Sequence, residues 1–186
     1  LAELADRCDI VTYEFENVPV TAAETLAATV PVYPPPKALE VAQDRVTEKR
    51  FLNASGIETA RFHAVDSQAD LERALADFGG EGVLKTRRLG YDGKGQKVYR
   101  KGDSAAGGYK ALGAVPLILE SFVPFVREVS IIAARGADGE VRCYDPTENV
   151  HRNGILHTST QPAAITPETA RAAREAATKL LEGLAY

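Results

Sequence analysis

The residues with the clearest chemical potential are three closely spaced glycines, Gly90, Gly93 and Gly95. Glycine has no side chain, so successive backbone N–H groups can converge on an anion at close range. Basic side chains surround these glycines in the sequence: Lys85, Arg87, Arg88 and Lys94. A glycine-rich backbone with positive neighbours is typical of sites that bind phosphate groups. The stretch therefore predicts a phosphate-binding loop.

A second interpretation of the same stretch is a solvated hairpin. Residues 83–85 and 97–99 alternate apolar and basic side chains, as half-buried strands do, so the chain must reverse between them. Asp92-Gly93 is a common hairpin turn, although the loop is longer than reversal requires. The two best-known phosphate motifs do not fit, because a strand follows the glycines where those motifs need a helix. The residues alone leave both interpretations open.

Several charged residues lie where predicted elements begin or end. Glu14 and Glu16 follow a predicted strand at 9–13, where carboxylates of α/β proteins often face a ligand, or they are exposed loop residues. Arg45 lies in the first turn of a predicted helix, where the helix dipole disfavours a cation. That position indicates either a bound partner or an ordinary exposed arginine. Glu128 begins another predicted strand and faces either a cleft or solvent.

The histidines and cysteines have no spacing typical of a metal motif. His151 and His157 flank a predicted hairpin turn at Asn153-Gly154, so they either approach each other or form separate surface hydrogen bonds. Cys8 and Cys143 stand alone in apolar or strand-like surroundings. We expect both cysteines to be reduced packing residues of a cytoplasmic protein.

The composition is that of an ordinary globular protein. The chain has 186 residues, of which 45% are hydrophobic and 26% charged, so it is long enough for one or two domains. A net charge of -4 argues against a broad nucleic-acid-binding face and favours a local site for a small anion. No apolar run approaches the ~18 residues of a membrane helix, and we expect neither a membrane nor a nucleic acid as partner.

The order of predicted elements indicates an α/β region followed by an α+β module. The chain begins with the end of a helix, a strand at 9–13 and a helix at 22–28 capped by Thr21. Prolines at 34–36 mark a domain junction. Asp44 caps the next helix. The elements predicted after it are a strand at 57–65, a helix at 71–78 opened by Ser67 and Asp70, the glycine-loop hairpin, a helix at 103–112, strands at 115–123, 127–134 and 140–144, and a helix from Thr166 to Leu184.

Five segments, in order, resemble the ATP-grasp ligases of purine biosynthesis that make 5-(carboxyamino)imidazole ribonucleotide. The segments are Tyr13-Glu-Phe-Glu-Asn-Val-Pro19, Gln43-Asp-Arg-Val-Thr-Glu-Lys-Arg-Phe-Leu52, Leu84-Lys-Thr-Arg-Arg-Leu-Gly-Tyr-Asp-Gly-Lys-Gly-Gln96, Glu128-Val-Ser-Ile-Ile132 and Glu148-Asn-Val-His-Arg-Asn-Gly-Ile-Leu-His157. The resemblance spans essentially the whole chain. Within the ATP-grasp proteins, Gly-Tyr-Asp-Gly-Lys-Gly-Gln together with Glu-Asn-Val-His is specific to this family.

The resemblance implies an incomplete ATP-grasp fold of α/β and α+β character. Residues 1–35 correspond to the C-terminal part of a Rossmann-like preATP-grasp domain, and residues 36–56 to a helical linker. Residues 57–125 correspond to the small antiparallel ATP-grasp subdomain with the glycine-loop hairpin. Residues 126–186 correspond to the start of the large subdomain.

The resemblance also implies a role for each candidate site residue. The residues matched to nucleotide contacts are Arg45, Lys85, Gly90, Tyr91, Asp92, Gly93, Lys94, Gly95, Gln96, Glu120, Ser121, Phe122, Val123, Glu128 and His151. Among these, residues 90–96 match the loop over the phosphates, and residues 120–123 match the connector that holds adenine. Glu128 matches the carboxylate on the ribose hydroxyls. Tyr91, Asp92 and Lys94 match residues near the reacting groups, with Asp92 as the candidate for handling the amine proton.

The implied reaction uses ATP and Mg²⁺ to phosphorylate bicarbonate. The 5-amino group of aminoimidazole ribonucleotide then attacks carboxyphosphate, or CO₂ released from it, giving ADP and phosphate. The family is usually homodimeric. Two alternatives remain: a non-catalytic nucleotide-binding fragment, and another purine-pathway ATP-grasp ligase, such as one acting on glycinamide ribonucleotide.

The two ends of the chain depart from the family pattern. The family's first strand and glycine-rich turn correspond to positions before Leu1, and its Mg²⁺ ligands to positions after Tyr186. We therefore expect no metal ligands within this chain. We also expect these 186 residues alone to bind nucleotide weakly without turnover, with activity belonging to a longer parent chain.

Overall fold

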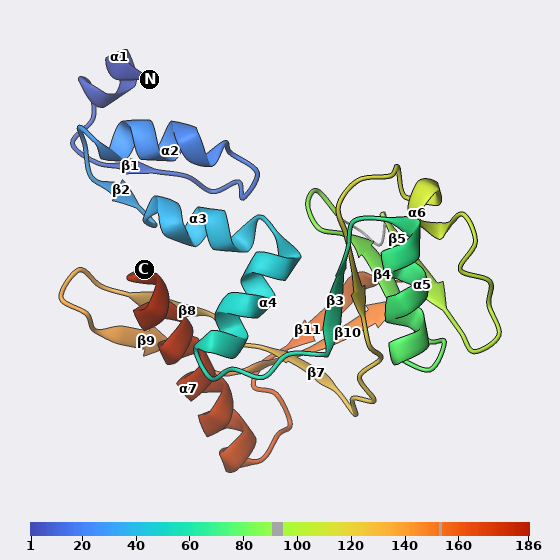
Figure 1. The fold of residues 1–186 in the computed structure, drawn as a ribbon. Coiled ribbons are helices and arrows are strands. Elements are labelled where there is room, and N and C mark those ends of the chain that lie inside the picture. Colours follow the sequence, from blue (N-terminus) through green and yellow to red (C-terminus); the bar gives the residue numbers. More distant parts are fainter. Residues whose placement is uncertain (91–94, 153) are drawn as a thin grey trace.

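The computed structural model describes residues 1–90, 95–152 and 154–186 (Figure 1). Its elements, in chain order, are α1 (Ala2–Ala5), β1 (Val11–Thr12), α2 (Val20–Ala27), β2 (Val32–Tyr33), α3 (Pro36–Ala42), α4 (Arg45–Ala54), β3 (Phe62–Val65), α5 (Gln68–Asp77), β4 (Gly82–Thr86), β5 (Gln96–Tyr99), α6 (Gly108–Ala111), β6 (Leu117–Glu120), β7 (Glu128–Ser130), β8 (Ala133–Arg135), β9 (Val141–Cys143), β10 (Thr147–Arg152), β11 (Ile155–Thr160) and α7 (Pro167–Leu184).

The N-terminal part is a parallel strand pair crossed by one helix. β1 pairs with β2 in parallel, and α2 makes the crossover between them (Figure 1). A small core of Leu26, Val30 and Val32 holds the helix against the strands. The predicted cap at Thr21 is wrong, because α2 begins two residues earlier than predicted, at Val20, with Pro19 at its N-cap. The predicted α/β character of this region is confirmed.

The main sheet has four antiparallel strands in the order β3-β6-β4-β5. Every residue of β6 is buried, so this strand is covered on both faces of the sheet. Side chains alternate between the two faces of a strand, so Leu84 of β4 and Leu119 of β6 point to the same side. Both belong to a core completed by Leu71 and Leu75 of α5. One face of the sheet is therefore sealed by α5, and Lys85 and Glu120 point to the other face.

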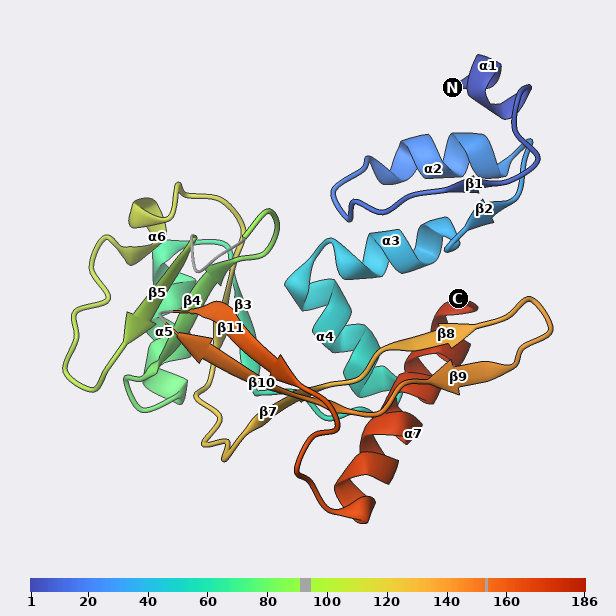
Figure 2. The same cartoon turned by 180° about the vertical axis from the view of Figure 1, so that it is seen from behind.

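A ribbon of later strands lies on the side of the sheet away from α5 (Figures 1 and 2). β10 forms a hairpin with β11 and also pairs with β7, and both pairings are antiparallel. β8 and β9 form a separate hairpin. The predicted single strand over 127–134 is therefore wrong, because the chain leaves one sheet after Ser130 and enters another at Ala133.

The last helix packs against helices that come before it in the sequence. α7 begins at Thr166 and Pro167 as predicted, with Thr166 accepting a hydrogen bond from the amide of Thr169. Leu184 packs with Ala38 and Val41 of α3 and with Phe51 of α4. The apolar face of α7 is thus covered by the helical segment that also supports the candidate site.

The predicted helix over 103–112 is largely wrong. Only Gly108–Ala111 is helical, because Gly107 adopts the left-handed conformation with φ 70° and ends any helix before it. Gly108 must also lack a side chain, since a Cβ there would lie 1.9 Å from the Tyr99 hydroxyl oxygen.

Both cysteines are free, as predicted. Among the helices that the structure describes, none is long and apolar enough to cross a membrane.

Candidate functional site

The open face of the main sheet carries a buried ion pair. Val83 of β4 lies opposite Glu120 of β6, so Lys85, two residues along β4, is the diagonal neighbour of Glu120 on the same face. The Lys85 Nζ lies 2.7 Å from Glu120 Oε2. Glu120 is 9% exposed, and few carboxylates are buried so deeply without a partner. Strand pairing alone therefore brings together two residues that lie 35 positions apart in the sequence.

A second lysine reaches the same carboxylate from α4. Lys49 Nζ lies 3.5 Å from Glu120 Oε1, and the Lys49 side chain is 15% exposed. Lys49 was not among the residues predicted for the site. Its position four residues after Arg45 was the available signal, because residues four apart share one face of a helix.

The N-terminus of α4 is fastened to the base of the glycine loop. Asp44 Oδ1 accepts hydrogen bonds from the amides of Val46 and Thr47, which confirms the predicted cap. The same oxygen lies 3.0 Å from Arg87 Nη2, and the Arg45 amide donates to the Arg87 carbonyl at 3.1 Å. On the other side of the loop base, the Thr86 amide donates to the Gly95 carbonyl at 2.8 Å. Helix and loop base therefore form one hydrogen-bonded unit.

The ionised form of Asp44 is stabilised in this setting. Burial alone would raise the pKa of Asp44, but the hydrogen bond from Arg87, the amides of Thr47 and Val46 and the charge of Arg87 together lower it below its ordinary value. The pKa of Glu48, one turn further along α4, shifts in the opposite direction. Burial raises its pKa although Arg45 and Lys49 oppose that shift.

We expect Asp44→Asn to lower the free energy of unfolding by about 1–2 kcal/mol at pH 7, because asparagine keeps the cap and removes the charge that pairs with Arg87. A lowered folded-state pKa contributes stability above the unfolded pKa of about 3.9, and that stability is lost as pH falls through the folded-state pKa. The difference between wild type and Asp44→Asn should therefore shrink toward pH 3.

Urea unfolding at a series of pH values measures this prediction. Asp44→Ala is the matched variant, because it removes the cap as well and should cost about 1 kcal/mol more at every pH. If the difference in the free energy of unfolding between wild type and Asp44→Asn stays constant from pH 7 to pH 3, the stabilisation does not come from the Asp44 charge.

Two cavities lie at the glycine-loop base. A polar one of about 110 Å³ is lined in part by Arg45, Gly90, Glu16 and Arg88. A larger one of about 540 Å³ is lined in part by Gly95, with Asp44 and Arg87 on its wall. Arg45 and Gly90 thus line one cavity and Gly95 lines the other, and the two cavities share Arg87 and Arg88 in their walls. Neither of these two cavities includes Glu128 or the connector.

Gly95, at the end of the glycine loop, has a backbone conformation that favours glycine. Its φ is 70°, a left-handed conformation that other residues rarely adopt, and a Cβ there would lie 2.9 Å from Thr86 Oγ1. Both observations require glycine at this position. Gln96, the next residue, begins β5 and pairs with Lys85 across the hairpin.

Glu128 and His151 form a pair on the ribbon. Glu128 of β7 lies opposite Asn149 of β10, so His151 is its diagonal neighbour, and His151 Nδ1 lies 3.0 Å from Glu128 Oε2. The Glu128 side chain is 43% exposed, so the carboxylate is open to solvent on one side. Of the two interpretations left open for His151 and His157, the strand pairing does not support a direct approach, because His151 lies opposite Leu156.

The connector after β6 presents apolar side chains to solvent. The Ser121 amide donates to the Arg61 carbonyl at 2.9 Å, which fixes the start of the segment. The guanidinium group of Arg100 lies over the Phe122 ring, with its carbon 4.4 Å from the ring centre. Val123 is half exposed. An apolar strip beside a buried carboxylate is well suited to the flat face and polar edge of an aromatic base.

The three residues predicted to act on the reacting groups, Tyr91, Asp92 and Lys94, lie outside the described residues, as does Gly93. The described site residues fall into three groups: Arg45 with Gly90, Gly95 and Gln96 at the loop base, Lys85 with Glu120 and the connector, and Glu128 with His151. The first two groups are linked through α4, because Glu48 lines the same cavity as Arg45 and Gly90 while the next residue, Lys49, pairs with Glu120. Among the residues that the structure describes, no group of three acidic, histidine or cysteine side chains is arranged to hold a metal ion.

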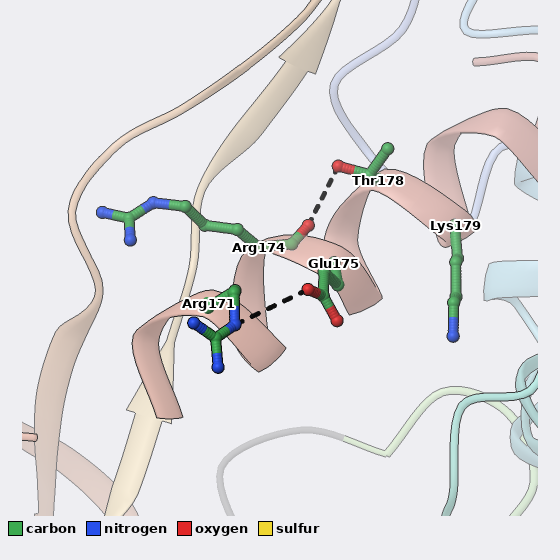
Figure 3. Close-up of a pocket in the computed structure, with 5 residues that line it drawn as sticks. All are labelled: Arg171, Arg174, Glu175, Thr178 and Lys179. Atoms are coloured by element: carbon green, nitrogen blue, oxygen red, sulfur yellow. Dashed lines mark hydrogen bonds and ion pairs between the residues drawn. The ribbon is translucent and has the colours of Figure 1, made fainter. Parts of the chain in front are cut away.

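A surface hollow of about 440 Å³ along α7 lies apart from these groups. Figure 3 shows its lining, which comes entirely from one helix: Arg171, Arg174, Glu175, Thr178 and Lys179. Arg171 and Glu175 form an exposed ion pair at 3.9 Å, and the Thr178 hydroxyl donates to the Arg174 carbonyl. These are contacts of an ordinary helix surface, so we do not include this hollow in the candidate site.

Two family models match the chain. The ATP-grasp domain model matches residues 50–186, and the ribonucleotide synthetase preATP-grasp domain model matches residues 1–43. The chain is 58% identical to an N5-carboxyaminoimidazole ribonucleotide synthase of Brucella melitensis, over the whole chain and 52% of that relative. The chain thus spans about half the length of the curated relatives it matches.

Solved structures give the same result. The ADP complex of an N5-carboxyaminoimidazole ribonucleotide synthetase matches with a TM-score of 0.92 at 38% identity, over 99% of this chain and 49% of that one. An Aspergillus clavatus synthase in complex with ADP and 5-aminoimidazole ribonucleotide matches with a TM-score of 0.81 at 26% identity, over 98% of this chain and 48% of that one. The ATP-grasp fold predicted from the sequence is confirmed, and it is partial.

Proposed function

The chain belongs to the ATP-grasp family, and we propose that it supplies the nucleotide-binding part of an N5-carboxyaminoimidazole ribonucleotide synthase. The complete enzyme would carboxylate 5-aminoimidazole ribonucleotide with bicarbonate at the expense of ATP. The observation that carries this proposal is the Lys85–Glu120 pair, which lies on the open sheet face between the glycine-loop base and the connector.

Lys85 is the residue that we assign to the nucleotide phosphates. Its ammonium group stands on the face of β4 that α5 leaves open, and β4 leads directly into the glycine loop. Phosphoryl transfer is catalysed mainly by positioning and by positive charge that offsets charge on the phosphoryl oxygens. Arg45 and the amides of residues 90–96 would add to this effect at the loop base.

The connector and the ribbon are assigned to the nucleoside. Residues 120–123 would hold adenine, with backbone groups at its polar edge and the apolar side chains of Phe122 and Val123 against its face. Glu128 would accept hydrogen bonds from the ribose hydroxyls. His151 lies 3.0 Å from the Glu128 carboxylate and so can hold it in position from the neighbouring strand.

The proposed chemistry has two steps. An oxygen of bicarbonate attacks the γ-phosphorus of ATP, and ADP leaves as carboxyphosphate forms. The amine of aminoimidazole ribonucleotide then attacks the carboxyl carbon, or CO₂ released from it, and phosphate and a proton are lost. We propose Asp92 for the amine proton, and Tyr91 and Lys94 as further residues that act on the reacting groups. A loop closed over these groups would keep water from the reactive intermediate.

Mg²⁺ is a further part of the proposal. It would offset phosphoryl charge, and among the described residues no group of three acidic, histidine or cysteine side chains is arranged to hold it. We also propose a cytoplasmic location and a homodimer for the complete enzyme.

The test is ADP release by the polypeptide that carries this sequence. ADP release that requires both bicarbonate and aminoimidazole ribonucleotide is the expected result. Release that instead requires glycine and phosphoribosylamine would assign another purine-pathway ligase. ADP binding without release under any of these conditions would leave a nucleotide-binding role and contradict the catalytic proposal.

A further inference from the structure

One buried carboxylate is shared by two lysines from different elements. Lys85 of β4 is 2.7 Å from Glu120 Oε2, within the normal range of a hydrogen bond. Lys49 of α4 is 3.5 Å from the other oxygen, Oε1, which is longer than a good hydrogen bond. Glu120 therefore has one close partner and one that has room to move closer.

The proposed function gives the close partner a second negatively charged group to bind. If Lys85 binds a nucleotide phosphate, its ammonium group turns from Glu120 toward the ligand. A buried carboxylate that loses its only partner is strongly destabilised. Lys49 is 15% exposed, and it can approach Oε1 without entering the nucleotide site.

The surroundings of Lys49 favour this role. The other acidic group beside it is Glu48, whose pKa burial raises even though Arg45 and Lys49 oppose the shift. Burial therefore acts against the ionised form of Glu48. Arg50, the residue after Lys49 on the same helix, is exposed and offers a matched control for Lys49.

We infer that Lys49 is a positioning residue, which holds Glu120 in place while Lys85 is engaged with the nucleotide. This inference rests on the proposed function in one respect only, the movement of Lys85 to a phosphate. That the two lysines replace each other as partners of Glu120 can be tested without any ligand.

The first experiment is a double-mutant cycle on stability. Lys49→Met and Lys85→Met each leave Glu120 one partner, so each should change the unfolding equilibrium constant by no more than about fivefold, as for partly exposed ion pairs. The double variant leaves Glu120 alone. Its unfolding constant should exceed the product of the single effects by roughly tenfold or more. In a Glu120→Gln background this excess should vanish.

The second experiment is calorimetric titration of ADP. Lys49→Met should weaken ADP binding by roughly tenfold through its effect on Glu120, since coupled neighbours typically show effects of this size. Lys49→Arg should restore affinity to within about threefold because it keeps the charge. Arg50→Met should bind ADP like the wild type.

Two outcomes would overturn the inference: a stability cycle in which the single effects simply multiply, or ADP affinity that Lys49→Met leaves unchanged. Failure of the proposed function would give a different result from failure of this inference. In that case the wild-type chain fails to bind ADP, and the unfolding cycle alone decides whether the two lysines share the carboxylate.

Discussion

Lys85→Met is expected to weaken the binding of ATP with Mg²⁺ by roughly 10- to 100-fold, the loss typical of a hydrogen bond between charged groups. The lysine is the basic residue of β4 on the face that α5 leaves open, and its Nζ is already held at the site by Glu120. Methionine keeps most of the side-chain length and removes the charge. The affinity is measured by titration calorimetry on both proteins at the same ionic strength.

The matched control for Lys85 is Lys97 on the same hairpin. Lys97 lies opposite Leu84, and its ammonium group is 4.6 Å from the Tyr99 ring centre, so it points to the other face of the sheet. Lys97→Met should therefore bind ATP like the wild type. Equal affinities for wild type and Lys85→Met would remove this lysine from the nucleotide site.

Leu119→Ala is expected to lower the free energy of unfolding by about 2–5 kcal/mol, the range for deleting a fully buried leucine. Leu119 is 0% exposed in the central strand, and Leu84, Leu71 and Leu75 belong to the same core. Neighbours on β3 and β4 fix the backbone on both sides, so the core cannot easily collapse into the space that the leucine leaves.

Urea unfolding measures the Leu119 prediction, with Val98→Ala as its control. Val98 lies on the edge strand β5 and is 44% exposed, so its truncation should cost about 0.5 kcal/mol or less. Since a domain of this size is stable by only about 5–15 kcal/mol, the two variants should differ clearly in midpoint. Similar midpoints would show that the core around α5 does not limit stability.

The elements that the sequence predicted best are those with strong local signals. The alternation of Val83-Leu84-Lys85 produced the correct hairpin, and Asp44 and Thr166 were correctly predicted as helix caps. Each of these signals acts through neighbours a few residues away. Periodicity and capping are sufficient in such cases because no distant partner has to be known.

The errors arose where distant contacts decide the structure. The run over 127–134 is uniformly strand-like, but β7 pairs with β10 and β8 pairs with β9, so the break after Ser130 depends on partners far along the chain. Thr21 is a good capping residue, yet α2 starts earlier after Pro19. Local preference was outweighed by tertiary structure in both cases.

The candidate site was predictable as a set of residue types and not as a set of contacts. Lys85, Glu120, Glu128 and His151 were each expected from the family resemblance. Their pairing into Lys85–Glu120 and Glu128–His151 depends on strand register, which no local pattern specifies. Lys49 was missed because it belongs to a helix whose orientation toward β6 is set by tertiary packing.

The strand order of the main sheet also affects how the protein is made. β6 joins β3 to β4, so during translation its residues leave the ribosome after both of its neighbours. Until then the β3–α5 segment and the β4–β5 hairpin have no shared strand, and the apolar side of α5 lacks Leu117 and Leu119 to cover it. The nascent chain must therefore carry an incomplete core for the time needed to synthesise residues 100–120, an interval in which chaperone binding would protect it from aggregation.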